Sequence, residues 1–167
     1  MPYVREIVGQ DHPTLRRVAK KVDPKEIREP LFQQLIDDMF ETMYAAPGVG
    51  LAAPQVNVSK RIFVMDVNDE HPPAVVINPK LEVFDEVVEI REGCLSVPGM
   101  IGEIVRYKRA AVTCLDREGR KIRIEGEGLL AQCLQHEVDH LNGALYIDRA
   151  KNVRPAVSEE EKEVAEA

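Results

Sequence analysis

The sequence predicts an α+β fold, in which antiparallel or mixed β-sheets pack around a central helix that carries the motif HExxH. Three observations support this class. Apolar residues recur with helical spacing in two long segments, 25–46 and 129–141. Between them, short runs rich in Val and Ile are separated by turn residues, as in strands joined by hairpins. A chain of 167 residues fits one domain, so we expect helices and strands to share one structure.

Two helices are predicted before the strands. Asp11 and Pro13 are typical of the start of a helix and predict a short one over 11–19, with Asp11 as its cap. The longer helix, over 25–46, carries an apolar stripe toward the core and is ended by Pro47 and Gly48. The stripe comprises Leu31, Leu35, Met39 and Met43, with Phe32, Ile36, Phe40 and Tyr44 beside it.

The strands are predicted in the middle of the chain. Four of them cover 61–67, 74–77, 80–84 and 87–90, and a hairpin over 105–116 and 121–125 turns through 117–120. Ahead of them lies the segment GVGLAAPQ, residues 48–55. Its small residues and glycines allow the backbone to approach another group closely.

The second long helix is predicted over 129–141, followed by a stop at Asn142 and Gly143. It has few polar positions, so we expect it to be buried on most sides. Residues 1–150 are predicted to form a single domain, and 151–167 an acidic tail. The last ten residues, SEEEKEVAEA, are expected to be solvated or frayed.

Composition limits the classes of function. The net charge of −7 argues against binding of free nucleic acid, which needs a basic surface. Three widely spaced cysteines are no disulfide framework and favour a cytoplasmic protein. Neither a signal peptide nor an apolar run of about 18 residues is present, so no membrane contact is expected. We expect a monomer.

The motif HExxH lies in the second long helix. His136 and His140 are four residues apart, so they share one face of a helix and can bind one metal ion. Glu137 lies between them and can act on a water bound to that metal. A metal with only two protein ligands needs a third to match the usual catalytic site.

Three positions compete for the third ligand. The pattern HExxH-xx-G-xx-H would place a histidine at position 146, but the residue there is Tyr146. Cys133 lies seven residues from His140, roughly 10 Å along the helix, too far for one metal to bind both easily. Cys94 follows a predicted strand and a glycine, so its thiol can point toward a crossing helix. We therefore predict a site formed by Cys94, His136 and His140.

The motif has two other interpretations. A chance HExxH would leave both histidines simply buried and hydrogen-bonded. A purely structural metal site prefers four protein ligands, and no fourth is evident in the sequence. With three protein ligands the metal would keep one coordination position open, which favours a catalytic site over a structural one.

Three segments, GVGLAAPQ (48–55), EGCLS (92–96) and QHEVDH (135–140), resemble the motifs of the peptide deformylase family in order and spacing. The resemblance implies removal of the formyl group from the formyl-methionine of newly synthesised polypeptides, with release of formate. It implies Fe(II) as the metal, with Zn, Ni or Co able to replace it. It also implies that Cys94, His136 and His140 bind this metal.

The resemblance also assigns roles to other residues. Glu137 is the expected general acid and base when metal-bound water attacks the formyl carbon. The amide of Gln55 and the backbone N–H of Leu95 are expected to stabilise the oxyanion. Family members can contact the ribosome through a basic C-terminal helix, whereas residues 158–167 are acidic here.

An apolar pocket must accept the methionine side chain. Val49, Leu129 and Cys133 are its predicted lining, and Gly50 is expected to offer backbone to the peptide in a strand-like contact. Glu92 is expected to orient its neighbours or the loop. Two rival functions are an HExxH endopeptidase and a non-catalytic binding module stabilised by a metal.

Overall fold

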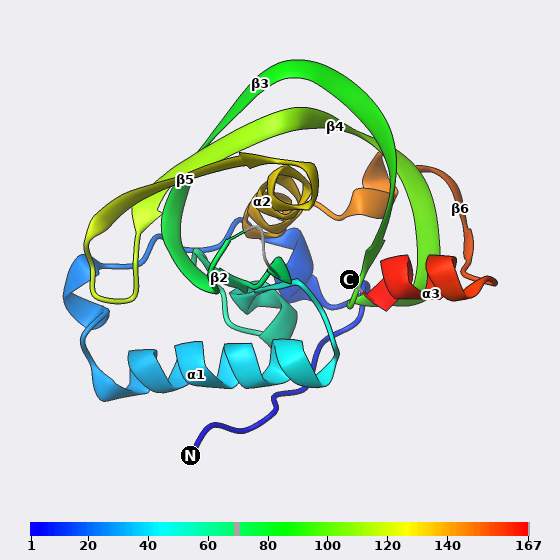
Figure 1. Cartoon of the computed structure of the whole chain (residues 1–167). Coiled ribbons are helices and arrows are strands. Elements are labelled where there is room, and N and C mark those ends of the chain that lie inside the picture. The colour runs from blue at the N-terminus through cyan, green and yellow to red at the C-terminus, as the bar shows by residue number, and fades with distance from the viewer. Residues whose placement is uncertain (69–70, 167) are drawn as a thin grey trace.

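The protein, described by a computed structural model over residues 1–68 and 71–166, is built on one curved antiparallel sheet (Figure 1). The order along the sheet is β1-β2-β3-β4-β5, and β6 pairs with β4. Neighbouring strands pair antiparallel throughout this path, which confirms the predicted α+β class with an antiparallel sheet. The strands are β1 (Gly50–Ala52), β2 (Ile62–Met65), β3 (Ala74–Cys94), β4 (Val97–Leu115), β5 (Lys121–Glu127) and β6 (Lys151–Pro155).

β3 is one long strand where the sequence predicted three short ones. The pairing of β3 with β4 shifts register between Ile77 and Lys80 and again between Phe84 and Val87. These are the two gaps between the predicted strands. Asn78 and Asp85 have φ angles of 53° and 65° there, so the strand bends without ending. β3 and β4 therefore arch over the helix below them (Figure 1).

The α-helices are α1 (Pro30–Ala45), α2 (Gly128–Leu141) and α3 (Glu159–Glu166). Short 3-10 turns cover Pro13–Arg16, Pro24–Glu26, Ala53–Val56 and Tyr146–Asp148. No helix in the described ranges is long and apolar enough to cross a membrane.

The start of the chain departs from the prediction. The segment 11–19 contains only a four-residue 3-10 turn, and its cap is the ring of His12 rather than Asp11. α1 begins at Pro30 instead of Lys25, because a separate turn at Pro24 precedes it. Two residues of the predicted stripe are on the surface: Leu31 is 84% exposed and Tyr44 is 49% exposed.

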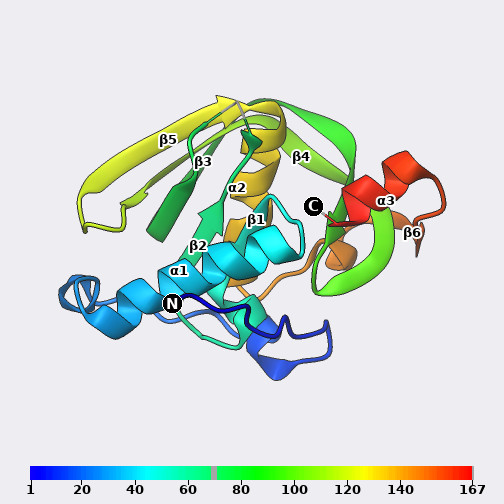
Figure 2. The ribbon, with the colours of Figure 1, turned by 60° about the horizontal axis from the view of Figure 1, so that its bottom comes forward.

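The apolar core lies on both sides of β2. Phe63 and Met65 point toward α2, whereas Ile62 and Val64, on the other face of the strand, point toward α1. The layer of β1 and β2 therefore lies between two helices, as Figure 2 shows from below. Its strands are apolar at every position because both faces are covered.

The C-terminal segment is ordered, so the expectation of a solvated or frayed end is wrong for its described residues. Ser158 caps α3 by accepting a hydrogen bond from the Glu161 N–H, 3.0 Å away. Three glutamates fill the first turn, where negative charge stabilises the helix dipole. α3 packs on β3 and β4, and its Ala165 is only 4% exposed (Figure 2).

Candidate metal centre and active site

The two histidines of HExxH lie together on α2. His136 and His140 are one helical turn apart, and their Nε2 atoms are 3.1 Å from each other. Both side chains are buried. α2 is enclosed because the sheet packs on it and the loop after it returns through Tyr146.

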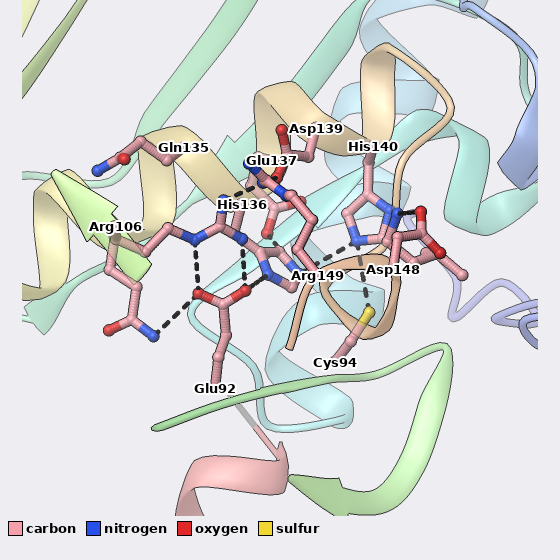
Figure 3. A network of polar contacts seen from close by, with 12 residues as sticks. Glu92, Cys94, Arg106, Gln135, His136, Glu137, Asp139, His140, Asp148 and Arg149 are labelled. Atoms are coloured by element: carbon pink, nitrogen blue, oxygen red, sulfur yellow. Dashed lines mark hydrogen bonds and ion pairs between the residues drawn. The ribbon is translucent and has the colours of Figure 1, made fainter. Parts of the chain in front are cut away.

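Cys94 completes the group. It is the last residue of β3, and the chain turns immediately to pair Cys94 with Val97 of β4. Its Sγ atom lies 3.4 Å from Nε2 of His140, and the ligand atoms of Cys94, His136 and His140 all lie within 4.8 Å of one another. The structure therefore brings the three predicted ligands together (Figure 3).

This donor set fits a divalent metal. In a tetrahedral zinc site, bonds of about 2.0 to 2.3 Å place two nitrogens roughly 3.3 Å apart, and a sulfur and a nitrogen roughly 3.6 Å apart. The separations here, 3.1 Å and 3.4 Å, are close to both values. A thiolate with two imidazoles leaves a fourth position for water or substrate.

The two rejected ligand candidates lie beside the group without joining it. Cys133 is buried, and its Sγ is 3.9 Å from the carbonyl oxygen of Val49. The ring of Tyr146 stacks on His136 with centroids 6.4 Å apart. Both residues therefore lie next to the site, and neither belongs to the cluster of possible ligands among the described residues.

A buried charge network supports His136 from behind (Figure 3). Oε2 of Glu92 lies 2.6 Å from Nδ1 of His136, and Arg106 donates two hydrogen bonds to the same carboxylate at 2.6 and 3.1 Å. Burial would raise the pKa of Glu92, but His136 and Arg106 more than offset this and lower that pKa to about 2. Glu92 therefore stays ionised and holds the imidazole in one orientation.

The network continues to the surface through Asp139. Its Oδ2 atom accepts hydrogen bonds from Arg106 and from Arg149, each 2.7 Å long. The sequence assigns no role to Arg106 and Asp139. Arg106 is followed by Lys108 and Arg109 on the same strand, so no local pattern marks it as the buried one.

Glu137 lies on the other side of the histidines. Its Oε2 atom is 3.9 Å from Nε2 of His136, and its Oε1 atom is buried without a hydrogen-bond partner in the described part of the chain. Burial is the main cause that raises the pKa of Glu137 to about 7, with His136 opposing it. A carboxyl with such a pKa can accept and return a proton near neutral pH.

Gly50 keeps the space beside Glu137 open. A Cβ atom at this position would meet Oε2 of Glu137 at 2.7 Å and Sγ of Cys133 at 2.9 Å. Any side chain would therefore displace one of these groups. The predicted close approach of the segment 48–55 is thus an approach to the carboxylate of HExxH.

Gln55 reaches the site from the turn after β1. Its Oε1 atom accepts a hydrogen bond from the Ala52 N–H at 3.0 Å, which fixes the orientation of the amide. The Nε2 group therefore points toward Cys94 Sγ at 3.7 Å and Ser96 Oγ at 3.2 Å. Leu95 follows Cys94 in the hairpin turn, so its backbone lies next to the same sulfur.

A pocket of about 100 Å³ opens beside the histidines. Val49, Leu129 and Cys133, all three predicted, contribute to its wall, and Gly50 lies behind it. The full lining is Val49, Arg91, Glu92, Gly93, Leu129, Gln132, Cys133, His136, Glu137 and Val164. Val164 belongs to α3, whose residues the sequence predicted to be solvated or frayed.

Comparison with known proteins supports one family. The model of the polypeptide deformylase family matches residues 4–156. A peptide deformylase from Symbiobacterium thermophilum is 49% identical over 98% of this chain and 76% of its own length. One from Hahella chejuensis is 54% identical over 89% of this chain and 88% of its own length.

Solved structures agree with the sequence relatives. A peptide deformylase from Legionella pneumophila superposes with a TM-score of 0.82 at 44% identity and covers 97% of this chain and 90% of its own. One from Synechococcus elongatus, in complex with actinonin, has a TM-score of 0.82 at 40% identity, with 96% and 83% covered.

Proposed function

Because this chain belongs to the polypeptide deformylase family, enzymes that hydrolyse an N-formyl group, we propose that it deformylates newly synthesised polypeptides. The substrate is the N-terminal formyl-methionine, and the products are formate and a free amino terminus. One observation carries the proposal. Glu137, Gln55 and the group of Cys94, His136 and His140 lie together beside an apolar pocket, which His136 and Glu137 help to line.

Cys94, His136 and His140 would hold the metal. When bound, a divalent ion lowers the pKa of a water in its open position toward about 7 and so supplies the nucleophile. Thiolate and imidazole ligands suit iron and zinc alike. We propose Fe(II) from the family resemblance, with Zn, Ni or Co as alternatives.

Glu137 is proposed as the general acid and base. Its carboxylate takes a proton from the attacking water, whose oxygen bonds to the formyl carbon. It then gives that proton to the amide nitrogen as the C–N bond breaks. The burial that raises its pKa to about 7 suits both transfers at neutral pH.

Gln55 and Leu95 are proposed to stabilise the oxyanion that forms on the formyl oxygen. The Gln55 amide is held in place before the substrate arrives, because the Ala52 N–H fixes its oxygen. Such preorganised donors need no rearrangement during the reaction and are typically worth about 3 kcal/mol each. The Leu95 N–H lies on the same turn as the metal-binding sulfur.

The pocket is proposed to accept the methionine side chain. Val49, Leu129 and Cys133 present apolar groups to it, whereas Gly50 leaves room for Glu137. An unbranched, flexible side chain suits a narrow apolar pocket of this kind. The α2 helix, which carries both histidines and part of the pocket wall, is the element on which we infer that the site is built.

The remaining assignments follow from the same proposal. Residues 1–150 are the catalytic domain, the protein acts as a monomer in the cytoplasm, and its partners are nascent formylated peptides. A transient ribosome contact would bring the enzyme to them. The acidic residues 158–167 make that contact differ from one formed through a basic helix.

The test is formate release from a formyl-Met peptide by protein purified without oxygen, with metal analysis of the same sample. We expect formate in proportion to bound metal, and none from a Glu137→Gln variant that retains its metal. Cleavage of an internal bond in an unformylated peptide would instead support the endopeptidase alternative. A full metal load without formate release would support a binding module.

A further inference from the structure

The C-terminal helix α3 lies on the pocket that the proposed function assigns to methionine. Val164 lines this pocket together with Val49 and Leu129, which come from distant parts of the chain. In Figure 3 the helix, in faint red, lies below Glu92 and the end of β3. The pocket wall is therefore completed by the last residues of the chain.

Gly93 marks the closest contact. A Cβ atom at this position would lie 2.5 Å from Cα of Ala165 and 2.7 Å from the carbonyl oxygen of Val164. The absence of a side chain at Gly93 thus creates room for another backbone beside the strand. In this structure, the backbone of α3 occupies that room.

The same place lies on the path of a peptide substrate. A peptide whose first side chain enters the pocket would leave it along lining residues, which include Val49, Arg91 and Gly93. Extended peptides commonly add their backbone beside such strands. A substrate of one residue would end at the pocket, whereas a longer one would extend toward the backbone of α3 beside Gly93.

The docking of α3 is weak enough to be displaced. Of its described side chains only Ala165 is buried, with Glu161 and Val164 partly so. Glu160 pairs with Arg91, and Glu161 pairs with Arg154 at 3.1 Å, and both arginines are more than a third exposed. Exposed ion pairs contribute little, and an element with few buried apolar contacts opens readily.

We propose that α3 makes the enzyme selective for peptide length. Val164 forms the outer wall of the methionine pocket. When the peptide extends beyond its first residues, α3 must move away from Gly93. The proposal rests on the proposed deformylase function. We therefore expect kcat/KM to be lower for long peptides than for short ones, and this difference to disappear when α3 is detached.

The experiment compares kcat/KM for formyl-Met amide and for a formyl-Met tetrapeptide in the metal-loaded, full-length enzyme. Glu160→Lys replaces the attraction to Arg91 by repulsion, and Glu163→Lys makes the same charge change at an exposed position of α3. We expect Glu160→Lys to raise the ratio of long to short substrate about two- to fivefold, the range for one exposed pair. Glu163→Lys should leave the ratio at the wild-type value.

Two further measurements keep the outcome decisive. Val164→Asp should raise the ratio at least as much, because a carboxylate is disfavoured in the apolar pocket. In Glu137→Gln protein, the tetrapeptide should lower the hydrogen-exchange protection of residues 159–166, whereas formyl-Met amide should not. Formate release with an unchanged ratio in both Glu160→Lys and Val164→Asp would overturn the proposal. Absence of formate from either substrate would instead refute the deformylase function.

Discussion

The Oε2 atom of Glu92 lies 2.6 Å from Nδ1 of His136, so a carboxylate on β3 fixes the orientation of a histidine on α2. With Nδ1 occupied, Nε2 is the atom that faces Cys94 and His140. Arg106 keeps the carboxylate ionised and is itself only 3% exposed. The curved strands and the helix are thus joined by the same charges that prepare the histidine for a metal.

Glu92→Gln should weaken metal binding about 10- to 100-fold, the usual effect of losing the partner of a histidine ligand. An amide is a weaker acceptor for Nδ1–H and leaves Arg106 without its buried counter-charge. Zinc affinity measured by competition with a chelator would show the change. Glu89→Gln, on the exposed part of the same strand, is the control and should bind like wild type. Equal affinities in both variants would contradict the supporting role.

The two cysteines near the site should differ in a spectroscopic test. In the cobalt-loaded protein, a thiolate ligand gives a charge-transfer band that serine cannot give. Cys94→Ser should lose this band and most of its metal, because the Sγ atom is part of the ligand group. Cys133→Ser should keep both, because its thiol lies against the Val49 carbonyl. The reverse pattern would identify Cys133 as the ligand.

Gly50→Ala should lower kcat at least tenfold without removing the metal. The added Cβ would lie 2.7 Å from Oε2 of Glu137, so the carboxylate must move, and small misplacements of a catalytic group are costly. Gly9→Ala is a matched control, since nothing lies within 4 Å of its Cβ position. Formate assays and metal analysis of both variants check the prediction. Wild-type kcat in Gly50→Ala would mean that Glu137 tolerates the shift.

Local patterns predicted much of the fold and the grouping of Cys94, His136 and His140. Helical spacing brought His136 and His140 together, since i and i+4 positions meet on any α-helix. The breaks predicted at 78–79 and 85–86 are real, but they are bulges inside one strand. A sequence shows where the hydrogen bonding between two strands is interrupted. It does not show whether the strand continues afterwards, because that depends on a partner strand far along the chain.

The parts that the sequence did not predict depend on long-range contacts. Arg106 binds Glu92 and Asp139, which are 14 and 33 positions away. The acidic charge of residues 158–167 predicts a frayed end, whereas the cap at Ser158 favours a helix. Ser158 followed by Glu161 is a helix-start pattern, yet Gly93, on which the helix packs, lies 71 residues before Val164.

Asp38 should make stability depend on pH at the acidic end. Its enclosed carboxylate accepts hydrogen bonds from the Tyr3 N–H at 3.0 Å, from Gln34 at 2.7 Å and from Arg5 at 3.0 Å. Burial would raise the pKa of Asp38, but these donors outweigh it and hold that pKa below the ordinary value. The folded state therefore binds the proton less readily than the unfolded state does.

The stabilisation from Asp38 is consequently complete above the unfolded pKa of about 3.9 and is lost as the pH falls through the folded value. Asp38→Asn should lower the free energy of unfolding by about 1 to 3 kcal/mol at pH 6, since hydrogen bonds to a charged group are lost. Urea unfolding of the metal-free proteins should show that the difference in the free energy of unfolding between wild type and Asp38→Asn becomes smaller below pH 4. Glu41→Gln, on the exposed face of α1, is the control and should show little difference. A difference in the free energy of unfolding that stays constant down to pH 3 would show that the charge of Asp38 does not stabilise the fold and that only the packing of its side chain does.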